Sequence, residues 1–94
     1  MPSSGSPLLR MTPRDNVAVA LKRLNAGDRA HVDGCDVEVA ELIPFGHKVA
    51  LSAIQVGGGV IKYGEIIGRA TSPIEAGQHV HVHNLQSARL PGHT

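Results

Sequence analysis

A four-residue pattern, an aliphatic residue followed by two others and a glycine, recurs four times between residues 24 and 77. Its copies are Leu24-Asn25-Ala26-Gly27, Ile43-Pro44-Phe45-Gly46, Ile54-Gln55-Val56-Gly57 and Ile74-Glu75-Ala76-Gly77. We interpret each copy as an apolar anchor and a tight turn, because glycine adopts the positive φ that such turns need. Corners at this spacing leave room only for short strands, so the sequence predicts a mainly β fold with little helix.

The spacing of these corners is too irregular for a solenoid, and the pattern could also recur by chance in a chain with 11 glycines. Residues 15–21 fit two structures, because Asp15 is a suitable helix N-cap while the apolar residues after it also alternate as in a strand. We favour the strand, since β character dominates the rest of the chain. The predicted strands are 17–22, 29–33, 36–42, 48–50, 60–62, 66–70 and 79–84.

Composition excludes several classes of partner. The chain has 94 residues, a net charge of +1, and only one Tyr and one Phe, so it lacks a basic footprint and aromatic platforms for nucleic acid. No apolar run approaches the roughly 20 residues that span a bilayer. The single cysteine, Cys35, cannot form an intrachain disulfide. We therefore expect a cytoplasmic protein with neither a nucleic-acid nor a membrane partner.

One ordered domain is expected to cover most of the chain. Residues 1–13 are rich in Ser, Pro and Gly and are predicted to be a flexible leader. Residues 14–86 are predicted to form the domain. Residues 87–94 are predicted to be a flexible tail, where a second domain can be joined.

The segment Gly77–Leu85 carries three histidines at alternate positions. In a strand, alternation places His79, His81 and His83 on one face and the two valines between them on the buried face. Imidazole suits proton transfer and metal binding near neutral pH. Same-face histidines of a strand lie about 6.5–7 Å apart, which is long for a shared metal unless the strand bends. A solvated row of histidines is the simpler interpretation, and His47 is the available further ligand.

Two other polar clusters follow glycine corners, Gly46-His47-Lys48 and Lys62-Tyr63-Gly64. Together with the histidine segment they offer acid/base groups and cations that can hold a carboxylate or sulfonate. A sugar acid is a ligand that fits this chemistry. Taken singly, each lysine is more often a surface residue, and Tyr63 is more often packed over its turn than catalytic.

Five segments in this order resemble the N-terminal SAF-type domain of the altronate dehydratase family, which also includes galactarate dehydratases and the small subunit of sulfolactate sulfo-lyase. They cover residues 15–21, 43–51, 60–64, 67–70 and 77–85. The Gly-His-Lys, Lys-Tyr-Gly and His-Val-His-Val-His-Asn elements are specific in combination. The resemblance extends over residues 14–86.

The resemblance implies a β-clip (SAF-like) fold and a lyase that eliminates water or sulfite from a sugar acid or hydroxy acid. It also implies a divalent metal, Fe²⁺ or Mn²⁺, held mainly by a larger catalytic subunit. Because this chain ends just after the histidine segment, we expect a small subunit that is inactive alone. The alternatives are a non-catalytic carbohydrate-binding or scaffolding module, and a free-standing metal-binding β domain.

Such an elimination needs a base, charge stabilisation for an enolate-like intermediate, and an acid for the leaving group. We expect the polar clusters to face the partner's cleft. The expected catalytic residues are His47, His81 and His83. The expected substrate-binding residues are Lys48, Lys62, Tyr63 and Asn84. The expected metal ligands are His79 and His81.

Overall fold

The computed structural model describes residues 6–87, which form short β-strands joined by turns and contain no helix. The strands are β1 (Leu8–Leu9), β2 (Val17–Ala20), β3 (Arg29–Val32), β4 (Cys35–Glu38), β5 (Lys48–Ala50), β6 (Gly59–Lys62), β7 (Glu65–Ala70), β8 (His79–Val80) and β9 (Leu85–Ser87). The prediction of a mainly β fold is confirmed. Nowhere in this part of the chain does a helix occur that is long and apolar enough to cross a membrane.

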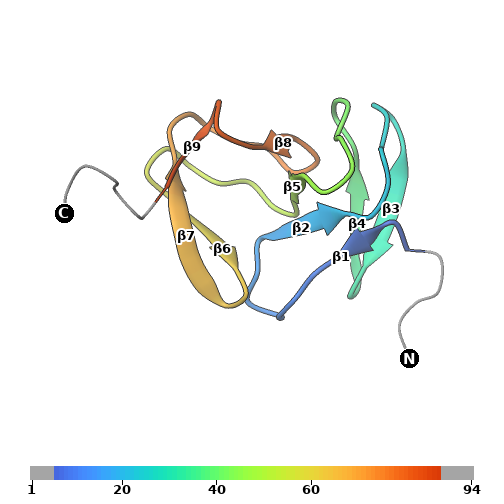
Figure 1. The fold of residues 1–94 in the computed structure, drawn as a ribbon, viewed down its shortest axis with the longest axis horizontal. Helices are drawn as coiled ribbons and strands as arrows, with labels where there is room; N and C mark the ends of the chain where they lie inside the picture. The colour runs from blue at the N-terminus through green and yellow to red at the C-terminus, as the bar shows by residue number, and fades with distance from the viewer. Residues whose placement is uncertain (1–5, 88–94) are drawn as a thin grey trace.

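The strands form three small antiparallel sheets (Figure 1). A four-stranded sheet in the order β1-β2-β5-β8 occupies the middle of the molecule, the hairpin β3–β4 lies on one side, and the sheet β6-β7-β9 lies on the other. The register of the central sheet places Val49 of β5 opposite Ala18 of β2 and His79 of β8. Strand β5 therefore connects the two outer sheets through the centre of the fold.

The described chain contains two halves with the same backbone plan. In each half, a strand of the central sheet leads through a glycine corner into a hairpin and out through a second glycine corner. The shift between the halves is 30 residues from Leu24 to Ile54 and 31 residues from Gly46 to Gly77. Matching isolated bridges join the two corner anchors of each half, one between Leu24 and Ile43, the other between Ile54 and Ile74. The recurring sequence pattern thus marks a twofold structural repeat.

The four corners have the geometry that the sequence predicts. Their glycines, Gly27, Gly46, Gly57 and Gly77, all have φ between 81° and 92°. Their anchors are at most 5% exposed and belong to two separate apolar clusters, one in each half. The N–H of Gly46 donates to the carbonyl of Ala20, and the N–H of Gly77 donates to that of Ala50, both at 2.8 Å. The corners at Gly46 and Gly77 are therefore tied to the central sheet through their glycines.

Asp15 is a buried tether between the start of β2 and the turn of the β6–β7 hairpin. Its carboxylate accepts hydrogen bonds from the Thr12 hydroxyl (2.7 Å) and from the N–H groups of Thr12 (3.2 Å), Tyr63 (3.1 Å) and Gly64 (2.8 Å). Burial alone would raise the pKa of Asp15, but these hydrogen bonds lower it to about 2. The segment after Asp15 is a strand, so the helix alternative for residues 15–21 is wrong.

The prediction of a strand over residues 79–84 is wrong beyond Val80, because residues 81–84 form a turn. The Asn84 side chain closes that turn: its Oδ1 accepts from the N–H of His81 (3.0 Å) and its Nδ2 donates to the carbonyl of His79 (2.8 Å). Val82, expected on the buried face, is 81% exposed. The alternation of the sequence therefore does not reflect a strand here.

The other predicted strands are present, with ends shifted by up to four residues. Residues 1–5 of the predicted leader and 88–94 of the predicted tail lie outside the described residues. Within the leader, Leu8–Leu9 form β1, which pairs with β2, and Leu8 is only 3% exposed. Within the tail, Ser87 ends β9. The structure thus places residues 6–13 against the fold, which the Ser-rich and Pro-rich composition did not indicate.

Candidate functional site

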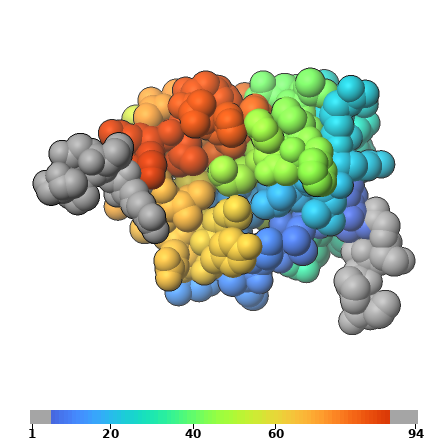
Figure 2. Space-filling model, viewed as in Figure 1, coloured from blue at the N-terminus to red at the C-terminus, as the bar shows by residue number. Residues whose placement is uncertain are grey.

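Two segments far apart in the sequence bring four histidines together. His47 directly precedes β5, while His79 begins β8, which pairs with β5. Nδ1 of His47 lies 2.8 Å from Nε2 of His79, so one of these nitrogens is protonated and donates a hydrogen bond to the other. Figure 2 shows the two segments, coloured light green and red, in contact on one face of the molecule.

The turn after β8 folds the other two histidines onto this pair. The ring centroid of His81 lies 4.2 Å from that of His47 and 5.3 Å from that of His79, and the ring of His83 lies 5.2 Å from His79. His47, His79 and His81 each present one ring nitrogen, and these three atoms lie within 4.8 Å of one another. The turn held by Asn84 therefore brings the rings of His79 and His81 closer together than a straight strand would.

The electrostatic surroundings of this histidine cluster are mostly cationic. Burial, followed by the neighbouring histidines, lowers the pKa of His79, and Glu41 acts in the opposite direction. Burial, His47 and Lys48 lower the pKa of His81. Burial and the charge of Lys62 lower the pKa of Lys48, which is partly buried. His79 and His81 therefore favour the neutral imidazole form, with the ammonium of Lys48 next to His81 and Lys62 near Lys48, an arrangement suited to proton transfer next to a bound anion.

Glu41 belongs to the site but was not among the residues predicted from sequence. Its Oε2 accepts a hydrogen bond from the backbone N–H of His79 at 3.1 Å. The two residues are 38 positions apart and lie in different halves of the fold. No local motif marks Glu41, because it lies in the segment between β4 and β5 next to exposed residues.

The remaining predicted residues take different places. Lys62 is close enough to Lys48 to affect its pKa, and its Nζ lies 5.4 Å from the centre of the Tyr63 ring. Tyr63 itself has φ of 57° in the β6–β7 turn, at the opposite edge of the molecule from β8 in Figure 1. Asn84 is 7% exposed and uses both groups of its amide within the turn. The structure gives Asn84 a positioning role, and ligand contacts of Asn84 and Tyr63 stay predictions.

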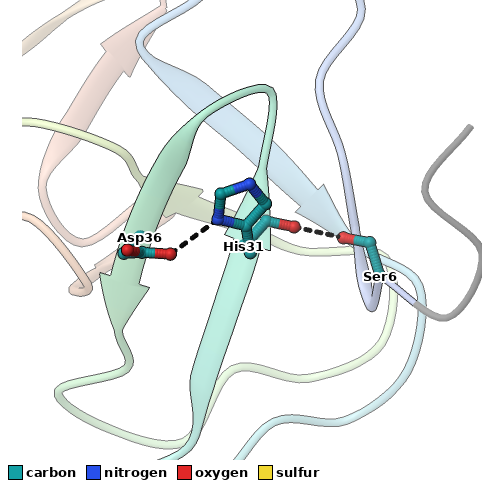
Figure 3. Close-up of polar contacts among 3 residues, drawn as sticks. All are labelled: Ser6, His31 and Asp36. Atoms are coloured by element: carbon teal, nitrogen blue, oxygen red, sulfur yellow. Dashed lines mark hydrogen bonds and ion pairs between the residues drawn. The ribbon is translucent and has the colours of Figure 1, made fainter.

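A second histidine–carboxylate pair lies on the β3–β4 hairpin (Figure 3). Nδ1 of His31 is 2.6 Å from Oδ1 of Asp36, while the Ser6 hydroxyl donates to the backbone carbonyl of His31 at 2.8 Å. Both side chains of the pair are more than half exposed. Since the serine contacts the carbonyl and not the ring, these three residues do not form a proton relay. They provide a histidine outside the cluster for comparison.

Comparison with known families identifies relatives of almost the whole described chain. A family model described as the altronate/galactarate dehydratase SAF domain matches residues 6–88. The chain is 39% identical over 79 residues to the altronate dehydratase of Bacillus subtilis (strain 168), and 48% identical over 73 residues to that of Escherichia coli (strain K12). These matches cover 84% and 78% of this chain but only 16% and 15% of the two dehydratases.

A shorter relative is the (2R)-sulfolactate sulfo-lyase subunit alpha of Paracoccus pantotrophus. It is 53% identical to this chain over 47 residues, which are 50% of this chain and 70% of that subunit. The matched region therefore occurs both as a small part of long dehydratases and as most of a short sulfo-lyase subunit.

Proposed function

Since this chain belongs to the altronate/galactarate dehydratase SAF domain family, we propose that it is the small component of a lyase that eliminates water or sulfite from a sugar acid or hydroxy acid. A larger catalytic subunit supplies the rest of the active site. Relatives are named both as dehydratases and as a sulfo-lyase subunit, which supports elimination of either water or sulfite. The chain spans about one sixth of the dehydratase of Bacillus subtilis, and the shorter relative is named as a subunit alpha, which supports a second component.

The observation that carries this proposal is the convergence of His47 with His79 and His81 from two corners of the fold. Elimination next to a carboxylate requires removal of a proton and protonation of the leaving group. Imidazole can do either near neutral pH. The packed imidazole cluster therefore provides the acid/base chemistry that the reaction needs.

Within this cluster we assign proton transfer to His47, His81 or His83. The ammonium group of Lys48 is next to His81 and would hold the carboxylate or sulfonate of the substrate, with Lys62 adding a second positive charge. The same charges would stabilise an enolate-like intermediate. The divalent metal that the family resemblance implies supplies a Lewis acid when bound.

The test is reconstitution of the chain with its larger partner, followed by turnover assays against altronate, galactarate and sulfolactate. We expect elimination from one of these acids, and a loss of about 10²-fold or more in His47→Ala, as for removal of a general acid or base. His31→Ala, a histidine outside the cluster, should retain full turnover. Unchanged turnover in His47→Ala, with only a weaker complex, would instead identify a non-catalytic scaffolding module.

A further inference from the structure

We propose that this chain itself binds one divalent transition-metal ion, through ring nitrogens of His47, His79 and His81. The expectation from sequence assigned the metal mainly to the partner and named two of these three residues as ligands. The present proposal places a three-histidine site within the small component. With His47 and His81 bound to a metal, His83 is the remaining candidate for proton transfer, so this site narrows the proposed function. Metal binding by the chain alone is measured without any turnover assay, so its failure is distinguishable from failure of the proposed elimination.

The spacing of the ring nitrogens supports this site. Metal-to-imidazole bonds are about 2.0–2.1 Å long, so two imidazole nitrogens on one ion lie about 3–3.5 Å apart. Nδ1 of His47 and Nε2 of His79 are already 2.8 Å apart, and one ring nitrogen from each of His47, His79 and His81 lies within 4.8 Å of the other two. Small side-chain rotations would therefore bring all three to one ion.

The backbone of each proposed ligand is fixed by its own hydrogen bond. The N–H of His47 donates to the carbonyl of Pro44 (3.1 Å), that of His79 to the carboxylate of Glu41 (3.1 Å), and that of His81 to Oδ1 of Asn84 (3.0 Å). Ligands held by a rigid frame lose little conformational entropy on binding, which strengthens metal affinity. This arrangement distinguishes the cluster from an exposed row of mobile histidines.

The donor set and its surroundings determine which ions fit. Imidazole nitrogens favour ions such as Fe²⁺, Co²⁺ and Zn²⁺, whereas Mg²⁺ and Mn²⁺ prefer carboxylate and carbonyl oxygens. The carboxylate of Glu41 beside His79 favours a cation, but the ammonium of Lys48 beside His81 opposes one. We therefore expect selective binding of the first group of ions, and tighter binding once the charge of Lys48 is removed.

Direct metal titration tests the proposal without any activity assay. The chelator-treated 94-residue chain is titrated with Co²⁺, followed by visible absorption, and with Zn²⁺ and Mg²⁺ by calorimetry. We expect one equivalent of Co²⁺ or Zn²⁺ and no saturable binding of Mg²⁺. His47→Ala and His81→Ala should each weaken Co²⁺ binding at least tenfold, whereas Lys48→Met should strengthen it.

His31→Ala is the matched control, because it removes a histidine that is paired with Asp36 on the β3–β4 hairpin. It should bind Co²⁺ as the unaltered chain does, and circular dichroism should show that every variant is folded. If His81→Ala does not fold, His81→Gln keeps a side chain of similar length without an imidazole. Absence of saturable one-to-one Co²⁺ binding, or an equal loss in His31→Ala, would overturn the proposal.

Discussion

The corners that close the two halves have the same backbone but use the following side chain differently. After Gly77, the side chain of Gln78 stays in its own corner, where Oε1 accepts a hydrogen bond from the N–H of Glu75 at 2.8 Å. After Gly46, the equivalent residue is His47, and the position equivalent to Glu75 is Pro44, which has no N–H. The His47 ring is therefore free to bind His79 instead.

The two remaining corners show the same contrast. Oδ2 of Asp28 accepts from the N–H of Asn25 at 2.9 Å, as Gln78 does in its corner, while Gly58 has no side chain at all. Backbone closure is common to all four, since the residue after each glycine donates its N–H to the carbonyl three residues earlier. A side chain thus becomes available for chemistry where the fold does not need it, and substitutions at equivalent positions of the two halves test this contrast.

Substitution of the corner glycines should give the largest difference between the halves. A Cβ at Gly77 would lie 2.0 Å from the carbonyl oxygen of Glu38, whereas a Cβ at Gly46 would meet nothing within 4 Å. Both have positive φ, which costs alanine about 1–2 kcal/mol. Chemical denaturation should show that Gly46→Ala loses only that amount, while the added clash makes Gly77→Ala lose more than about 3 kcal/mol. Equal losses would contradict the packing difference.

The next largest loss of stability should come from substitution of Asp15, which tethers the turn of the β6–β7 hairpin. Asp15 holds the turn at Tyr63 and Gly64, whereas the equivalent turn at Asp33 and Gly34 is open, since a Cβ at Gly34 would meet nothing within 4 Å. Asp15→Ala leaves two turn N–H groups without their acceptor and should cost about 2–3 kcal/mol of unfolding free energy. Asp33→Asn, which still tolerates positive φ, should change it by less than about 0.5 kcal/mol.

The same carboxylate predicts an acid-dependent loss of stability. Its pKa in the folded chain is about 2, below the value of 3.8 for a free aspartate. A depressed pKa means that the charged form stabilises the fold, so the contribution is fully present above about pH 4 and is lost as the pH falls towards 2. Thermal unfolding of Asp15→Asn should therefore depend less on pH between 4 and 2 than unfolding of the unaltered chain. Identical pH profiles would show that the carboxylate does not contribute.

The smallest losses of stability should distinguish a side chain that closes its corner, Gln78, from one that serves the histidine cluster, His47. Gln78→Ala removes a side-chain cap and should cost about 1 kcal/mol, as loss of a comparable turn or helix cap does. His47→Ala should cost less than about 0.5 kcal/mol, because its corner is closed by backbone alone. Urea denaturation of both variants measures these values, and a larger loss in His47→Ala would assign His47 to the fold.

The corners of the fold could be predicted from the sequence, but only part of the site could. The anchors and glycines of the corners were recognisable, because each corner is encoded by four consecutive residues. The turn at residues 81–84 was not, since its stability depends on Asn84 bonding back to His79 and His81, and alternation of His and Val is equally typical of a strand. Tertiary contacts such as Glu41 with His79 leave no local signal at all.

The central claim is that the two corners combine their histidines into one metal-binding site. Anomalous diffraction from crystals of the chain grown with Co²⁺ measures this directly. The predicted map has one strong peak within bonding distance of ring nitrogens of His47, His79 and His81. A peak only at the His31–Asp36 pair, or no peak at saturating Co²⁺, would contradict the claim.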